Sequence, residues 1–244
     1  MTIERPDSIL ITFYLFMIKI APIALLLVIE LFIFYKVSPS YAYPLRGLIH
    51  LYMAYWYYSE RKHAINLTDR LFLVSCLIPA ITPIPIFIFG FTWGTLVEVI
   101  LLLVSYQLLI KIYSLEGARI RLSSNFRTFS KVLVPFVFFP LIYFIISVLT
   151  IDRFDVILIL SIYLLQLMYM AVLSSYLPFK EKSKLCITMG MFFIMFASGA
   201  SFHRVYMSAY AFDYGIVRIA ANLGRILLII GLVNRVRRES FRVT

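Results

Sequence analysis

The sequence predicts an all-α membrane protein that folds as a polytopic bundle of eight transmembrane helices. Three observations support this prediction. Hydrophobic residues make up 62% of the 244 residues and charged residues only 14%, and a soluble domain of this size could not cover so much apolar side chain. Apolar runs of about 20 residues, the length that crosses a bilayer, recur along the whole chain. Lys and Arg residues lie mostly in the short connectors between these runs.

The predicted spans follow one another in a single transmembrane domain over residues 1–244. The first apolar run lacks a small-residue cleavage site and is therefore expected to remain as a span. The second is the shortest and begins at YPLRG, and the third contains three prolines, which a span tolerates where neighbouring helices satisfy the freed carbonyls. The fourth begins beside Trp93, which suits the outer membrane interface. The other four are apolar runs between polar connectors. The approximate ranges are 9–35, 43–59, 71–90, 92–113, 131–150, 155–177, 185–205 and 214–234.

The basic residues also predict the orientation of the chain. With eight spans, 16 of the 23 Lys and Arg residues fall on the side of the N-terminus and 4 on the opposite side. Cytoplasmic connectors carry such an excess of positive charge. Both termini are therefore expected in the cytoplasm, and the protein is expected to be a multi-pass protein of the cell membrane.

Several other classes of function are disfavoured. The net charge of +11 does not indicate nucleic-acid binding, because the basic residues occupy connectors rather than one soluble face. Cys76 and Cys186 fall within hydrophobic segments, which argues against a disulfide framework. The three histidines are far apart in sequence, so neither a metal site nor another cofactor is expected. The expected partners are membrane lipids and an amphiphilic small molecule.

The charged residues expected at membrane depth, away from the membrane surfaces, are Lys19, Glu30, Glu98, Arg218 and Arg225. Each costs about 2.5–3.5 kcal/mol unless it has a partner or a function. The helical rise places Glu30 about 7 Å, Glu98 about 9 Å and Arg218 about 6 Å below the outer ends of their spans. Lys19 and Arg225 are expected deeper, near the middle of the bilayer. Two acids and one arginine from three spans are therefore expected to share a level in the outer leaflet.

Further polar residues extend this layer. Arg218, Asn222 and Arg225 have the spacing i, i+4, i+7 and so share one helix face. Ser198, in the seventh span, falls at the same level as Arg218. The sequence therefore predicts a bundle with a polar interior near its outer end.

Several interpretations of this interior remain open. Glu30 and Glu98 could neutralise Arg218 and Arg225 and so hold the helices in register. The same charges could line an amphiphile pocket open to the outer leaflet, in which arginine faces a phosphate and a carboxylate acts on water. A transporter or sensor that uses the charges as a gate or relay is the alternative, which the prolines of the third span favour. A purely structural role in assembly is the simplest.

Three apolar stretches also resemble a known family. GTLVEVILLLVSYQLLIKIY, SIYLLQLMYMAVLSSY and GMFFIMFASGASFHR are similar to the fourth, sixth and seventh spans of the YhhN family of eight-span membrane proteins. The resemblance runs from YAYPLRG, before the second span, to the last predicted helix. The family includes lysoplasmalogenases, which hydrolyse the vinyl ether bond of lysoplasmalogens.

The chain departs from the family at the positions of its expected catalytic residues. The family's third span ends in Gly-Asp where this chain reads LVSCLIPAIT, and its seventh has Ser-Asp where Ser198 is followed by Gly199. The family's histidine in the fourth span is replaced by Ser105 or Tyr106. Its glutamine in the last span is replaced by Arg225. This chain therefore lacks the family's catalytic aspartates.

The resemblance implies binding of a lysophospholipid or similar amphiphile, with hydrolysis of an ether bond if other carboxylates have replaced the aspartates. Such hydrolysis needs a proton donor at the alkene and a base for water. Glu98 and Glu30 are the candidate catalytic residues. The candidate ligand contacts are Arg218, Asn222, Arg225 and Ser198.

Overall fold

The computed structural model describes residues 6–120, 132, 134–149, 151 and 153–235. Over these residues the chain consists of helices joined by short connectors, without a β-sheet. The helices are α1 (Pro6–Lys36), α2 (Pro39–Arg61), α3 (Leu67–Ile81), α4 (Pro83–Leu115), the π-helix η1 (Val134–Phe138), α6 (Phe139–Val148), α7 (Phe154–Ser174), α8 (Glu181–Tyr206) and α9 (Asp213–Val233). The expectation of an all-α fold is confirmed.

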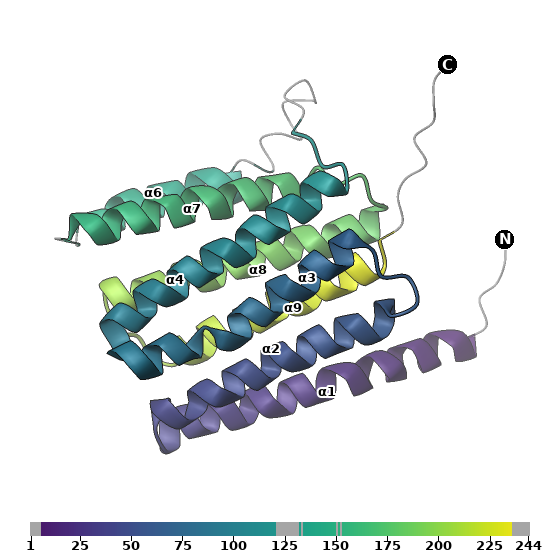
Figure 1. The fold of residues 1–244 in the computed structure, drawn as a ribbon, viewed down its shortest axis with the longest axis horizontal. Helices are drawn as coiled ribbons and strands as arrows, with labels where there is room; N and C mark the ends of the chain where they lie inside the picture. The colour runs from purple at the N-terminus through teal and green to yellow at the C-terminus, as the bar shows by residue number, and fades with distance from the viewer. Residues whose placement is uncertain (1–5, 121–131, 133, 150, 152, 236–244) are drawn as a thin grey trace.

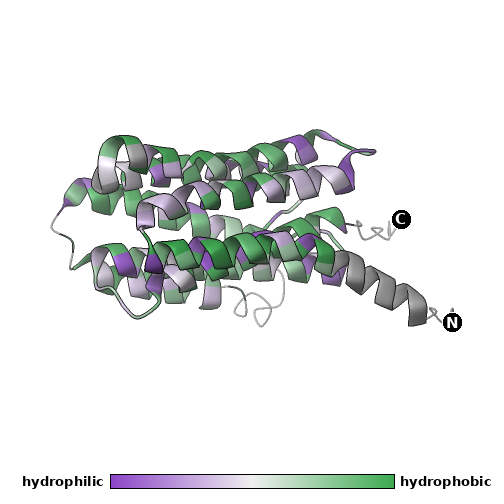
Figure 2. Ribbon diagram, turned by 90° about the horizontal axis from the view of Figure 1, so that it is seen from below, coloured by the Kyte–Doolittle hydropathy of each residue, from purple (hydrophilic) through white to green (hydrophobic). Residues whose placement is uncertain are grey.

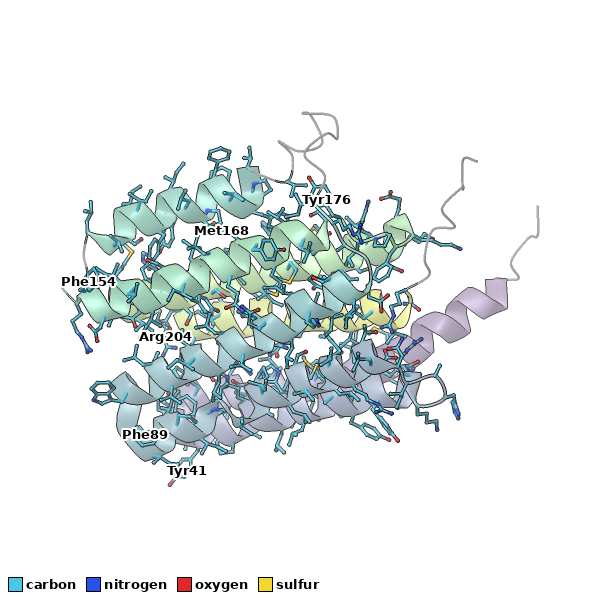
Figure 3. The ribbon with its side chains drawn as sticks, turned by 45° about the horizontal axis from the view of Figure 1, so that its top comes forward. Tyr41, Phe89, Phe154, Met168, Tyr176 and Arg204 are labelled. Carbon is cyan, nitrogen blue, oxygen red and sulfur yellow. The ribbon has the colours of Figure 1, made fainter. Side chains whose placement is uncertain are left out.

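The long helices lie side by side in one bundle, with α1 and α2 along one edge and α6 and α7 along the opposite edge (Figure 1). Figure 3 shows Tyr41, Phe89, Phe154 and Arg204 towards one end of the bundle, with Tyr176 towards the other. We call the first end the Arg204 end. The starts of α2 and α7 thus lie at the same end as the last turn of α8, as expected for helices that alternate in direction.

Six helical segments among the described residues are long and apolar enough to cross a membrane. They are Met17–Lys36, Leu67–Ile86, Trp93–Leu115, Phe154–Ser174, Glu181–Tyr206 and Asp213–Val233. Large apolar side chains such as Leu25, Val28 and Phe32 of α1 are exposed. Hydrophobic residues extend along most of the length of the helices (Figure 2). Because a soluble protein would bury such faces, the bundle is suited to a membrane.

Two predicted spans differ from these six segments. The second span corresponds to α2, which is 23 residues long but less apolar than the others. The fifth corresponds to the shorter apolar segment Val134–Val148, and residues 131, 133 and 150 of that prediction lie outside the described residues.

The boundary between the third and fourth predicted spans is marked by Gly90. Its φ of 72° lies in the left-handed region, which glycine adopts without a steric penalty. A Cβ atom on Gly94 would lie 2.4 Å from the Cα atom of Ile86, so the backbones on the two sides of Gly90 are in contact. The chain therefore doubles back at Gly90, as the predicted spans 71–90 and 92–113 require.

The third predicted span lacks one backbone hydrogen bond at Pro83, within the segment Leu67–Ile86. Pro83 has no N–H group to donate to the carbonyl of Pro79, four residues earlier. The hydroxyl of Thr82 donates to that carbonyl oxygen instead, at 3.0 Å. The boundary between α3 and α4 at Thr82 marks the place where a side-chain donor replaces a backbone donor, while the backbone of Thr82 keeps helical angles, with φ of −59° and ψ of −24°.

Helices α8 and α9 approach each other through glycines. A Cβ atom on Gly190 would lie 2.7 Å from the carbonyl oxygen of Gly224, and a Cβ atom on Gly224 would lie 2.7 Å from that of Gly190. Small residues allow such close packing between membrane helices. This contact fixes α9, with its polar stripe, against α8.

An ionic network joins the ends of α2, α3, α4 and α9 opposite the Arg204 end. The Arg235 guanidinium lies 3.0 Å from a carboxylate oxygen of Asp69 and 3.2 Å from one of Glu116. The Tyr57 hydroxyl donates to Asp69 at 2.5 Å. Arg235, which the charge count places in a cytoplasmic connector, is therefore also a structural contact between four helices.

Candidate functional site

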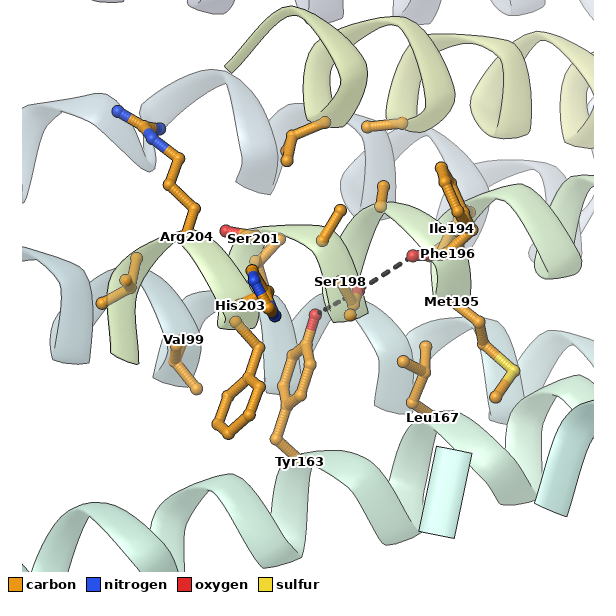
Figure 4. A pocket seen from close by; sticks show the side chains of 18 of the residues that line it. Val99, Tyr163, Leu167, Ile194, Met195, Phe196, Ser198, Ser201, His203 and Arg204 are labelled. Carbon is orange, nitrogen blue, oxygen red and sulfur yellow. Dashed lines mark hydrogen bonds between the residues drawn. The ribbon is translucent and has the colours of Figure 1, made fainter. Parts of the chain in front are cut away.

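A cavity of about 700 Å³ lies between α2, α3, α4, η1 and α6 to α9. One side is formed largely by apolar and aromatic residues of α6 and α7, such as Phe139, Phe144 and Leu164. Figure 4 shows part of the wall formed by α7 and α8. The polar lining residues include Tyr43, Arg46, His50, Glu98, Tyr163, Ser198, Arg218 and Arg225. The expected polar interior is thus hollow and lies against an apolar wall.

Glu30 and Arg218 form a bidentate ion pair between α1 and α9. The Nε atom of Arg218 lies 2.5 Å from Oε1 of Glu30, and the Nη2 atom lies 3.1 Å from Oε2. The Tyr214 hydroxyl donates to Glu30 Oε1 at 2.5 Å. Arg218 lines the cavity, whereas Glu30 is 0% exposed and is not part of the lining. Glu30 therefore has no direct contact with the cavity and affects it only by holding the Arg218 side chain in place.

Glu98 lines the cavity and forms an ion pair with Arg46 of α2. The charge count places Arg46 on the outer side of the membrane and not among the charges at membrane depth, but α2 begins at Pro39 and so carries Arg46 within the helix. Arg46 precedes His50 by one helical turn, and this spacing is the signal that could have identified both as residues of one polar face. Glu98 is thus neutralised by α2 and not by the arginines of α9.

The expected position of Lys19 near the middle of the bilayer is also corrected. Lys19 forms an ion pair with Glu60, which lies in the last turn of α2. Its side chain is 37% exposed. Helix α1 begins at Pro6 and is 31 residues long, which is more than a bilayer requires. Lys19 therefore lies towards the end of the bundle opposite the cavity's charged pairs.

Ser198 belongs to a chain of hydroxyl groups on the cavity wall. Its hydroxyl donates to the carbonyl oxygen of Ile194 at 2.9 Å, so it accepts the hydrogen bond from the Tyr163 hydroxyl, also at 2.9 Å (Figure 4). The Tyr106 hydroxyl lies 3.3 Å from that of Tyr163. Tyr163 and Tyr106 were absent from the predicted site, and only their positions in the quoted α7 and α4 stretches hinted at them.

Arg225 also lines the cavity, but its environment differs from that of Arg218. Its Nη1 atom donates to the backbone carbonyl of Ser75 at 3.2 Å, and its guanidinium contacts the Cys76 thiol. Within the described part of the chain, no carboxylate lies within ion-pair distance of Arg225. Neutralisation by the acids, the first interpretation of these charges, therefore holds for Arg218 and leaves Arg225 without an acid among the described residues.

Asn222, between the two arginines on α9, is 1% exposed and is not part of the cavity lining. Neither its amide nitrogen nor its amide oxygen has a hydrogen-bond partner among the described residues. A buried polar group without a partner costs about 1–3 kcal/mol. The described residues therefore leave the hydrogen-bonding groups of Asn222 unsatisfied.

The mouth of the cavity carries a second polar group near the end of α8. The Tyr143 hydroxyl lies 2.7 Å from Nδ1 of His203, and Ser208 Oγ lies 3.2 Å from its Nε2. Arg204 forms an ion pair with Asp213 at 3.2 Å. These contacts hold the end of α8 against α6 and the start of α9.

Comparisons with known proteins give no further assignment. No family model matches the chain, and neither a curated protein nor a solved structure matches it. Among the described residues, no group of three or more His, Cys, Asp or Glu side chains could hold a metal ion. The site must therefore be interpreted from its own geometry: a large cavity with two neutral Arg–Glu pairs, one arginine without an acid, and an apolar wall.

Proposed function

We propose that this chain is an eight-span protein of the cell membrane, with both termini in the cytoplasm, and a divergent relative of the YhhN family. The side-chain contacts support this topology. The Arg61–Asp69 and Arg235–Glu116 contacts join helix ends that the charge count assigns to the cytoplasmic side, and Lys19, within α1, pairs at the same end with Glu60 in the last turn of α2. The pairs on the opposite half include Glu30–Arg218, Arg46–Glu98 and Arg204–Asp213.

The proposed function of the cavity is to bind a lysophospholipid or similar amphiphile from the outer leaflet. One observation carries this proposal: the same 700 Å³ cavity contains Arg46, Glu98 and Arg218 on one side and the aromatic and aliphatic side chains of α6 and α7 on the other. An amphiphile has the same division between a polar headgroup and an apolar chain. Clefts of about 300–1,000 Å³ with a few placed polar groups are typical of small-molecule sites.

If the bound lipid is hydrolysed, Glu98 is the acid/base residue in this proposal. Glu98 lines the cavity and can reach a ligand, whereas Glu30 is covered by Arg218 and Tyr214. Hydrolysis of a vinyl ether begins with a proton transferred to the alkene carbon, after which water adds to the adjacent carbon bonded to oxygen. The Glu98 carboxylate is ion-paired with Arg46, so it must first take up a proton from water; it then donates this proton to the alkene carbon and accepts one from the water that adds. Glu30 would act as a positioning residue for Arg218.

The experiment is a binding and turnover assay with purified protein in detergent. A lysophospholipid and a lysoplasmalogen of the same chain length are titrated, and release of the aldehyde from the lysoplasmalogen is followed. Glu98→Gln is expected to abolish turnover while retaining binding. The matched control is Glu60→Gln, which removes an acid from an ion pair outside the cavity lining.

The outcomes separate binding from chemistry. Turnover that persists in Glu98→Gln would exclude the assigned chemistry. Absence of saturable binding of either lipid by the folded protein would exclude the amphiphile proposal itself.

A transporter is the second candidate, and the network around Arg235 favours it. That network links α2, α3, α4 and α9 at the end opposite the cavity's charged pairs, where a gate of an alternating-access protein would lie. The prolines of the third predicted span also favour this candidate, because Pro-interrupted segments often line transport sites. Uptake of an amphiphile or other solute into proteoliposomes that increases in Arg235→Gln would favour this candidate over the enzyme.

A further inference from the structure

Arg225 places a positive charge deep in the bundle. It lies 12 residues after Asp213, the first residue of α9, and the helical rise puts it about 18 Å below that end. This is near the middle of a hydrocarbon core about 30 Å thick. Its side chain is only 5% exposed. An arginine at this depth with no acid among the described residues leaves a buried charge that the chain does not compensate.

Two buried polar residues near the same depth lack hydrogen-bond partners. Asn222, one turn before Arg225, has both amide atoms free of partners among the described residues. His50 of α2 is 4% exposed, and its Nδ1 atom is likewise unpartnered in the described part of the chain. His50 lies about 17 Å and Asn222 about 14 Å from the starts of their helices. His50 is also within electrostatic reach of the Arg225 guanidinium.

The cavity gives access to this group. Arg225 and His50 both line it, together with Arg46 and Arg218 nearer the Arg204 end. Arg46 is neutralised by Glu98, and Arg218 by Glu30. An anion that enters the cavity therefore meets neutral pairs first and an uncompensated cation at its deep end.

We propose that Arg225, Asn222 and His50 form a binding site for one anionic group at the deep end of the cavity, with Arg225 and His50 on the cavity lining and Asn222 buried one helical turn from Arg225, where the bound anion brings its amide into contact. The occupant is a free inorganic anion or the phosphate of a lipid headgroup, which share the required chemistry. The guanidinium and the Asn222 amide nitrogen supply donors, and His50 supplies a third when its Nδ1 atom carries the proton. A water molecule could satisfy the hydrogen bonds but not the charge, and a buried charge without a counter-charge is costly. The free-anion form does not depend on the amphiphile proposal, whereas the headgroup form rests on it.

Anion-dependent thermal unfolding of the purified protein in detergent tests the site. Gluconate is replaced by chloride, bromide or inorganic phosphate at constant ionic strength, so that general screening stays the same. The wild-type protein is expected to show a saturable rise in Tm with at least one of these anions or with a phospholipid ligand. Arg225→Gln should remove the rise, and Asn222→Leu should weaken the apparent affinity about tenfold, the loss expected for a hydrogen bond to a charged group. Arg153→Gln, at an exposed arginine outside the cavity lining, should behave as the wild type.

Two lipids identify the source of the anionic group. Lysophosphatidylcholine and a monoacylglycerol with the same chain are compared, since only the first carries a phosphate. A phosphate headgroup at the site predicts that lysophosphatidylcholine, but not the monoacylglycerol, gives an Arg225-dependent rise in Tm and abolishes any effect of the free anions. A free anion at the site predicts that neither lipid changes the anion effect.

The proposal is overturned if no anion and no phosphate lipid stabilises the protein in a way that Arg225→Gln removes. If Arg225→Gln does not fold, the test uses Asn222→Leu instead. An unchanged apparent affinity for the anion in that variant would also overturn the proposal. Binding of the monoacylglycerol without any anion effect would support amphiphile binding while excluding the anion site, so the two proposals can fail separately.

Discussion

Replacing Glu30 with glutamine should strongly destabilise the protein, because Arg218 would lose its counter-charge in a buried position. The two side chains are 0% and 3% exposed, and the guanidinium makes two hydrogen bonds to the carboxylate. Removing one partner of a buried ion pair costs about 3–5 kcal/mol. The exposed pair Lys19–Glu60 is the matched comparison, with side chains 37% and 26% exposed, and such pairs contribute about 0–1 kcal/mol.

The assay is thermal unfolding of the wild type, Glu30→Gln, Arg218→Gln and the double variant in the same detergent, with Glu60→Gln as control. The double variant should be much more stable than the sum of the two single losses predicts, because it leaves no unpaired charge. If Glu30→Gln lowers stability no more than Glu60→Gln, the ion pair does not stabilise the contact between α1 and α9. The same result would remove Glu30 as the residue that positions Arg218.

Two further substitutions test the packing around the site. Gly224→Ala should cost about 1–3 kcal/mol of stability, because the added methyl group forces α8 and α9 apart. In the control Gly199→Ala the new Cβ atom would meet nothing within 4 Å, so this variant should be neutral or more stable by up to about 1 kcal/mol. Equal shifts in thermal unfolding would contradict the close approach of the two helices. Arg235→Gln should cost about 3 kcal/mol, because it leaves buried acids in the network, while Arg70→Gln on the exposed face of α3 should have little effect on the unfolding midpoint.

The sequence predicted the helical segments because apolar length is a local property. The predicted spans 155–177, 185–205 and 214–234 agree closely with α7, α8 and α9. The reversal between the third and fourth spans was also placed correctly, at Gly90. The predicted span 9–35 also agrees closely with α1, but composition near the N-terminus does not mark where this long helix leaves the membrane.

The partners of the buried charges could be predicted only in part. Depth along each span brought Glu30 and Arg218 to one level, and the structure joins them. The same reasoning could not assign Glu98 to Arg46, since helical periodicity gives the face of a residue but not which helix lies opposite. Asn222 and His50 show the same limit, because their lack of partners depends on the packing of α2 and α9 and has no signal in either segment alone.

The two arginines of α9 should therefore respond differently to the loss of charge. Arg218 is compensated by Glu30, so Arg218→Gln leaves an acid buried and should destabilise the protein with or without a ligand. Arg225 has a carbonyl and a thiol beside it rather than an acid, so Arg225→Gln removes an unfavourable buried charge and gives up a hydrogen bond to Ser75. Without a bound anion these two effects oppose each other, and the substitution should change stability little.

With saturating anion the wild type gains stability that the variant cannot, because only a ligand that binds the folded state raises the unfolding midpoint. A large destabilisation of Arg225→Gln in the absence of any anion would mean that another group already compensates this charge, and the deep end of the cavity would then have no need of an anionic ligand.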